Sequence, residues 1–173
     1  MNNKAIRQIL VFSLLLALQI LVFNHIHLFG FLNPNIYLLA LLLLPLELPK
    51  SAQYAIAFVA GFIVDIFQMS ILGVNTSASM IVILLRPYVM NLLNVNKKKS
   101  EMDVPKPGKK DFKWLVLYTL ILTFAHQFFI TMLEVFSFQR FGLVLLSIVS
   151  NTLCTSLIIL CSEYIFIPTK KNS

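Results

Sequence analysis

Four polar side chains stand deep inside long apolar stretches of this sequence: Asp65, Arg86, His126 and Asn151. An ionisable group at the centre of a bilayer costs about 2.5–3.5 kcal/mol on insertion scales, so it normally faces a partner inside a helix bundle. A carboxylate, a guanidinium, an imidazole and an amide could hydrogen-bond one another or a partner protein. They are therefore the first candidates for a site, and the segments that carry them decide which of them can meet.

Asp65 and His126 are expected at a similar depth. Asp65 comes fourteen residues after Ser51, and His126 comes thirteen residues after Lys113, in two segments that run in the same direction. At a rise of 1.5 Å per residue, both lie roughly 20 Å from the ends where their helices begin. One hypothesis is that they meet in a carboxylate–imidazole hydrogen bond. The alternative is that Asp65 only reaches the outer interface through Gln68 and the turn that follows it.

Arg86 and Asn151 share a depth nearer the midplane. Pro87 has no N–H, so a helix through it leaves the carbonyl of Ile83 free and is expected to kink. Arg86 could bond that carbonyl, Asn151 or a lipid phosphate. A long basic side chain can also snorkel about 10 Å to the cytoplasmic headgroups, and the sequence favours this second interpretation.

Other chemistry is not supported by the residue spacing. His25 and His27 have no third metal ligand nearby, and no Ser/His/Asp set, phosphate loop or pair of carboxylates falls at a common depth. Cys154 and Cys161 lie seven residues apart, which on a helix is about 10 Å of rise and too far for a disulfide. The sequence therefore predicts no enzyme, no cofactor and no metal site.

Composition places most of the chain in lipid. Of its 173 residues, 58% are hydrophobic and only 12% are charged, whereas a soluble domain has about a quarter of its residues charged. The net charge of +7 comes from loops and tails between apolar runs, which is typical of a membrane protein and not of a nucleic-acid-binding one. We expect a single all-α integral membrane domain over residues 1–173.

Six transmembrane helices are predicted, at about 6–23, 34–48, 52–67, 76–93, 113–133 and 141–167. Asn33 and Pro34 have the types that begin a helix, and Pro49 is expected to end the second one. The third span covers only roughly 20–22 Å of a hydrocarbon core that is about 30 Å thick. It must be tilted, shielded by its neighbours or extended by the loop before it.

Basic residues set the orientation. Predicted inner segments carry Lys4, Arg7, Lys50, seven lysines over 97–113, Lys170 and Lys171, whereas the three outer loops share only Arg140. The positive-inside rule then places both termini and the lysine-rich loop 94–112 in the cytoplasm. No small-residue cleavage site follows the first apolar run, so we expect it to remain as a helix.

The third and fourth spans carry a family resemblance. The stretch Ala60-Gly61-Phe62-Ile63-Val64-Asp65-Ile66-Phe67, with Gly73 after a short turn and Asn33-Pro34-Asn35 before the second span, resembles the rod shape-determining protein MreD family. The specific residues lie mostly between Pro34 and Tyr88, and beyond them the similarity is one of topology. The loop 97–113 matches no feature of the family; it is expected to be a solvated topology signal, and the alternatives are contact with anionic lipids or with cytoplasmic partners.

The resemblance implies a non-enzymatic component of the bacterial cell-elongation machinery, in the inner membrane. Such proteins are associated with MreC, with the MreB cytoskeleton and with the RodA–transpeptidase pair that builds peptidoglycan. Their fold is similar to the substrate-binding subunits of energy-coupling-factor vitamin transporters. In this interpretation Gly61 and Gly73 permit a close backbone approach or a tight turn, and Asp65 fixes the outer end of the third span.

Two functions remain open on these residues. The first is a membrane scaffold that binds an MreC-like partner by helix-face packing, with six candidate structural or partner-contact residues: Gly61, Asp65, Gly73, Arg86, His126 and Asn151. The alternative is a transport subunit with a solute pocket at its outer end, for which Asn75, Asp65 and His126 are the candidates. A third class, a membrane enzyme, lacks a catalytic constellation.

Overall fold

The computed structural model describes residues 3–25, 33–45, 48–68, 71–93, 112–134 and 141–166. Within these ranges the chain forms six α-helices and one short 3-10 helix, and no strand. The prediction of an all-helical protein is confirmed. The elements are α1 Asn3–Leu21, η1 Phe23–His25, α2 Tyr37–Leu42, α3 Lys50–Gln68, α4 Val74–Leu93, α5 Phe112–Glu134 and α6 Phe141–Phe166.

Four of these helices, α3 to α6, are long and apolar enough to cross a membrane. Each has at least 19 residues, close to the about 20 that a bilayer core requires. The apolar part of α1, Gln8–Leu21, is shorter. The chain is thus a multi-pass membrane protein by the length and composition of its helices, while the six-span topology stays a prediction.

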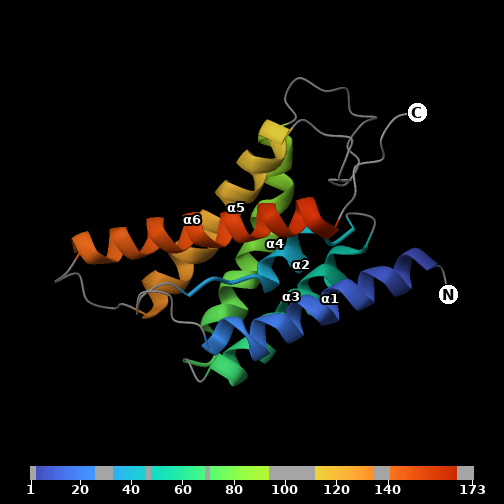
Figure 1. The fold of residues 1–173 in the computed structure, drawn as a ribbon, viewed down its shortest axis with the longest axis horizontal. Coiled ribbons are helices and arrows are strands. Elements are labelled where there is room, and N and C mark those ends of the chain that lie inside the picture. Colours follow the sequence, from blue (N-terminus) through green and yellow to red (C-terminus); the bar gives the residue numbers. More distant parts are fainter. Residues whose placement is uncertain are drawn as a thin grey trace.

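Sequential neighbours pack together in the second half of the fold. The main helix pairs are α3 with α4, α4 with α5, and α5 with α6, and α1 packs on α2 and α3. In Figure 1, α6 crosses in front of α4 and α5, and α2 lies in the middle of the assembly. The start of α1 and the end of α6 lie on the same side of this view.

The second helix differs from the prediction. A continuous helix was expected over 34–48, but α2 has only six residues, Tyr37–Leu42, and rises about 9 Å. The helix ends early because Pro45, three residues after its last residue, cannot donate to a helical carbonyl and disfavours helical geometry at Leu44. Such a piece cannot cross a bilayer by itself.

This short helix is the centre of the hydrophobic core. All six of its residues are buried, and they pack in one cluster with Leu15, Ala60, Ile83 and Leu122, which come from four different helices. Irregular backbone at membrane depth is tolerated only where protein surrounds it and satisfies its polar groups. The chain around α2 must therefore find hydrogen-bond partners on the neighbouring helices.

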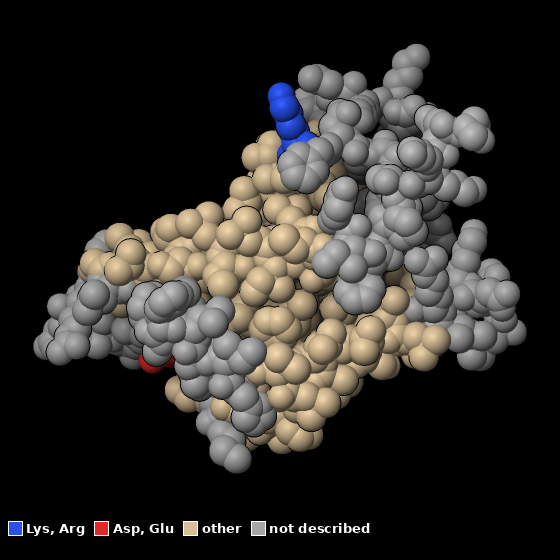
Figure 2. Space-filling view, in the orientation of Figure 1, with Lys and Arg blue, Asp and Glu red and all other residues tan. Residues whose placement is uncertain are grey.

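The described surface carries very little charge. Among side chains that the structure describes, the exposed charged ones are Lys50, Lys113 and Glu134, whereas Asp65 and Arg86 are buried. Figure 2 shows one face on which nearly all described atoms belong to uncharged residues. The predicted loop 94–112 lies outside the described residues except for Phe112, as does His27.

Candidate functional site

Asp65, near the end of α3, holds the beginning of α4. Its side chain is fully buried. Oδ1 accepts from the backbone N–H (2.8 Å) and the side-chain amide (3.0 Å) of Asn75. Oδ2 accepts from the N–H of Gly73 (2.9 Å) and from the N–H (3.1 Å) and hydroxyl (2.6 Å) of Thr76. The first N–H groups of a helix have no intrahelical partner and favour a negative charge, so this carboxylate stabilises α4 where it begins.

Two glycines make this arrangement sterically allowed. A Cβ added at Gly61 would lie 2.5 Å from the Cα of Thr76 and 2.8 Å from the carbonyl oxygen of Asn75, so α3 and the start of α4 touch backbone to backbone. Gly73 has φ +97°, a left-handed conformation that only glycine adopts without strain. The close approach lies at Gly61 and the turn at Gly73.

His126 belongs to a polar cluster that includes α2. Its Nε2 lies 2.8 Å from the hydroxyl oxygen of Tyr37, which also lies 3.0 Å from the Ser79 hydroxyl and donates to Oδ1 of Asn75 at 3.5 Å. Asn75 in turn donates to Asp65. All of these residues are buried.

The predicted direct contact between Asp65 and His126 is therefore wrong. Within the described residues the two side chains belong to one hydrogen-bonded chain, but Tyr37 and Asn75 stand between them. The alternative, that Asp65 reaches the outer interface, also fails, because its side chain is fully buried and all its partners are on the turn and α4.

Arg86 binds the C-terminal end of α2. Its Nε donates to the hydroxyl of Tyr118 (2.8 Å), and its Nη2 donates to the carbonyl of Leu42 (2.9 Å) and to that of Leu44. The last carbonyls of a helix lack intrahelical donors and attract positive charge, so the guanidinium satisfies groups that the early end of α2 leaves open. Tyr118 is itself held by a stacked contact with Trp114, with ring centroids 5.0 Å apart.

The expected snorkelling of Arg86 is wrong, because its side chain is fully buried. Its hydrogen bonds go to the α2 end and to Tyr118, so neither Asn151 nor the carbonyl of Ile83 is its partner in the part of the chain that the structure describes. Helix α4 continues through Pro87. The position of Arg86 along the sequence predicted that it lies deep within its helix, but not the direction in which its side chain points.

Asn151 and Thr155 of α6 bind the chain that leads into α2. The N–H of Asn33 donates to Oδ1 of Asn151 (2.7 Å), and the N–H of Asn35 donates to Oγ1 of Thr155 (3.3 Å). Thr155 also accepts from the side chain of Gln127 on α5 at 3.3 Å. The beginning of the α2 segment is thereby bonded to α6, at separations of 118 and 120 residues, and through Thr155 to α5.

Gln19 of α1 caps α2 itself. Its Oε1 accepts from the N–H of Ile36 (2.7 Å) and of Tyr37 (3.3 Å), where the first N–H groups of the helix need acceptors. Sequence analysis missed Gln19, and it also missed Tyr37, Tyr118 and Thr155. A signal existed for Gln19, which is a polar residue within an apolar run, like Asp65.

The site is thus a set of buried polar clamps around α2 and at the α3–α4 turn. The side chains of Gln19, Asp65, Arg86 and Asn151 each bond backbone groups that lipid could not satisfy, whereas His126 contacts the side chain of Tyr37. The described residues contain no group of three or more His, Cys, Asp or Glu side chains that could hold a metal ion. The positions of Gly61, Asp65, Gly73, Arg86, His126 and Asn151 are now defined, while a contact of any of them with a partner stays a prediction.

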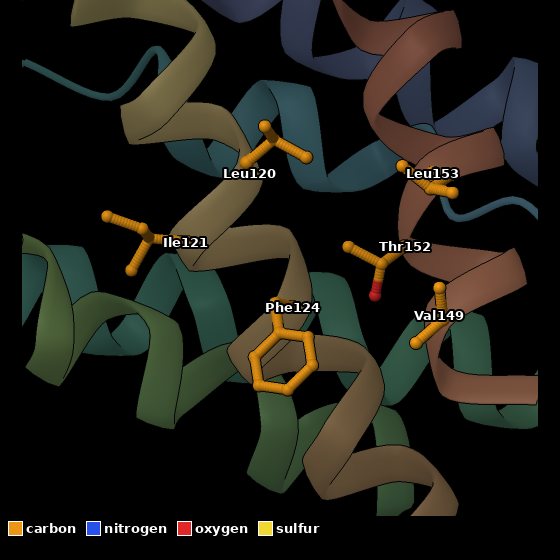
Figure 3. A pocket seen from close by; sticks show the side chains of 6 residues that line it. All are labelled: Leu120, Ile121, Phe124, Val149, Thr152 and Leu153. Carbon is orange, nitrogen blue, oxygen red and sulfur yellow. The ribbon is translucent and has the colours of Figure 1, made fainter. Parts of the chain in front are cut away.

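A separate groove lies between α5 and α6. It has a volume of about 370 Å³ and is lined by Leu120, Ile121, Phe124, Val149, Thr152 and Leu153. Figure 3 shows these side chains on the two facing helices, with the Thr152 hydroxyl as the one polar group among them. A groove with such walls suits an apolar occupant and not a polar solute.

Comparison with known proteins identifies the family. No curated protein and no solved structure matches the chain. A family model described as rod shape-determining protein MreD matches residues 3–106, more than half of the 173 residues. The match contains Gly61, Asp65, Gly73 and Arg86 and ends before His126 and Asn151. The chain belongs to the rod shape-determining protein MreD family, a family of membrane proteins that determine cell shape.

Proposed function

We propose that this chain is a non-enzymatic membrane scaffold of the cell-elongation machinery that binds a single-span, MreC-like partner. One observation carries the proposal: the buried side chains of Gln19, Asp65 and Arg86 are hydrogen-bonded to the protein's own backbone, while the described exterior is apolar (Figure 2). A protein built in this way offers helix faces, and helices associate in lipid through packing and a few polar contacts. RodA and its transpeptidase would join through the same complex, and MreB indirectly.

We infer that the chain lies in the bacterial inner membrane with both termini in the cytoplasm. Lys50 begins α3 and Lys113 stands at the beginning of α5, whereas Glu134 ends α5. Positive charge at one end agrees with a cytoplasmic location of that end. We also infer a fold similar to the substrate-binding subunits of energy-coupling-factor transporters, in which α2 would complete a six-helix arrangement.

The transport-subunit alternative has less support. It requires a polar pocket below the outer loops, but Asn75, Asp65 and His126 are buried and hydrogen-bonded to one another or to Tyr37. The groove between α5 and α6 is apolar. A polar solute would have to replace the hydrogen bonds that Asp65 and Asn75 already make within the protein.

Co-purification from the native host tests the proposal. The tagged protein is extracted in mild detergent, and the bound proteins are identified by mass spectrometry. Recovery of an MreC-like protein supports the scaffold. Recovery of an ATPase-linked membrane subunit, or of a small molecule in equal stoichiometry, overturns it in favour of transport.

An Asp65→Ala variant then tests whether the α3–α4 hairpin contributes to the contact with the partner protein. Its matched control is Ser77→Ala, because Ser77 lies in the first turn of α4 and its hydroxyl donates only to the carbonyl of Val74 at 3.0 Å. Loss of the partner from Asp65→Ala at an unchanged protein level, with retention by Ser77→Ala, places the hairpin in the contact.

A further inference from the structure

The hydroxyl of Tyr37 has three polar neighbours. Its oxygen lies 2.8 Å from Nε2 of His126, 3.0 Å from the hydroxyl oxygen of Ser79 and 3.5 Å from Oδ1 of Asn75. All four side chains are buried. A tyrosine hydroxyl can donate one hydrogen bond and accept two. All three contacts are therefore hydrogen bonds only if one neighbour accepts and the other two donate.

Asp65 sets the orientation of the Asn75 amide. Nδ2 of Asn75 lies 3.0 Å from Oδ1 of Asp65 and 3.0 Å from Oε1 of Gln68. Both oxygens of Asp65 also accept from backbone N–H groups, so this carboxylate acts as an acceptor. The oxygen and nitrogen of an amide are assigned from such partners, and the reverse orientation would place the amide oxygen against the carboxylate. Oδ1 of Asn75 therefore faces Tyr37, and it can only accept.

The proton of His126 follows from this assignment. Because Asn75 takes the one proton of the Tyr37 hydroxyl, Ser79 and His126 must donate to the Tyr37 oxygen. His126 then carries its proton on Nε2, and Nδ1 of the neutral ring is an acceptor. Nδ1 is buried and has no hydrogen-bond partner within the part of the chain that the structure describes. A buried N–H without a partner is rarer than an under-satisfied acceptor, which agrees with an unprotonated Nδ1.

We propose that Asp65 sets the direction of a hydrogen-bond relay in which His126 donates to Tyr37, Tyr37 donates to Asn75, and Asn75 donates to Asp65. The relay connects α5, α2, α4 and α3 in that order, and each of its protons points towards the buried carboxylate. Hydrogen bonds that point the same way polarise and strengthen one another. His126 is thus a positioning residue for the Tyr37 hydroxyl, and its protonated Nε2 is not available as a base or as a metal ligand.

The ¹⁵N NMR spectrum of the full chain in phosphatidylethanolamine–phosphatidylglycerol vesicles tests the position of this proton. His25→Asn and His27→Asn leave His126 as the one histidine of the sequence, and it is labelled with ¹⁵N. We expect a one-bond N–H coupling and the chemical shift of a protonated nitrogen at Nε2, and neither at Nδ1. A proton on Nδ1 alone overturns the proposal, because Tyr37 would then donate to His126. Protons on both nitrogens overturn it as well, because the ring would then be charged.

Two variants separate the relay from a local contact. Ser79→Ala removes the other donor to the Tyr37 hydroxyl but leaves the relay intact, so the proton should stay on Nε2. Asp65→Asn allows the Asn75 amide to turn over and donate to Tyr37, so a population of His126 with its proton on Nδ1 should appear. A proton that moves in Ser79→Ala, or that stays wholly on Nε2 in Asp65→Asn, contradicts the control by Asp65. If Asp65→Asn does not fold, Asn75→Ala makes the same test, because it disconnects Tyr37 from the carboxylate.

Discussion

Replacing Asp65 with alanine removes the acceptor of five hydrogen bonds at the start of α4. Three of the donors are backbone N–H groups that α4 cannot satisfy itself. A buried donor without a partner costs about 1–3 kcal/mol, and these costs are not additive because the turn can relax. A single hydrogen bond to a charged group contributes about 1.5–3 kcal/mol, and we expect Asp65→Ala to lose at least that much unfolding free energy.

The measurement is reversible unfolding of the purified protein in mild detergent by titration with SDS, followed by far-UV circular dichroism. Asp65→Asn keeps one carbonyl oxygen but loses the charge, so it should fall between wild type and Asp65→Ala. Ser77→Ala, the control in the first turn of α4, should lose less than about 1 kcal/mol, because the Ser77 hydroxyl makes one part-buried hydrogen bond. A loss below about 1 kcal/mol for Asp65→Ala would refute the clamp.

Three further predictions use the same unfolding measurement. Gly61→Ala should lower the unfolding free energy by about 1–3 kcal/mol or more, because the added Cβ would lie 2.5 Å from the Cα of Thr76. The control Gly142→Ala should be nearly neutral, because its added Cβ would meet no atom within 4 Å. Equal effects of the two changes would contradict the close approach of α3 and α4 at Gly61. Arg86→Lys should lower the unfolding free energy by about 1–3 kcal/mol although the charge is kept. The reason is that an ammonium group cannot reproduce the planar set of guanidinium N–H donors that bonds two carbonyls and the Tyr118 hydroxyl. An unchanged stability would show that the charge alone matters. Tyr37→Phe should lower the unfolding free energy by about 1–3 kcal/mol. A double-mutant cycle with His126→Leu should give a coupling energy of about 0.5–3 kcal/mol. Additive losses would mean that the 2.8 Å contact between the Tyr37 and His126 side chains contributes nothing to stability.

Composition and local spacing determined the class of this protein and most of its helices. The last four predicted spans, which begin at 52, 76, 113 and 141, differ by at most two residues at either end from α3, α4, α5 and α6. This agreement has a physical reason: an apolar run of about twenty residues bounded by polar or turn residues has few alternatives to a helix in lipid. Gly61, Asp65 and Gly73 were identified through the resemblance to the family, and their contacts are local along the chain.

Tertiary structure decided what surrounds each polar side chain. Position in sequence gives a residue's depth along a helix, but not the rotation of the helix or its neighbours, which come from packing. Hence Asp65 and His126, expected to touch, are separated by Tyr37 and Asn75, and Arg86 turns inward to carbonyls far away in the sequence. The early end of α2 follows from Pro45, but the sequence does not show that α1, α4 and α6 supply partners for the backbone groups that the short helix leaves open.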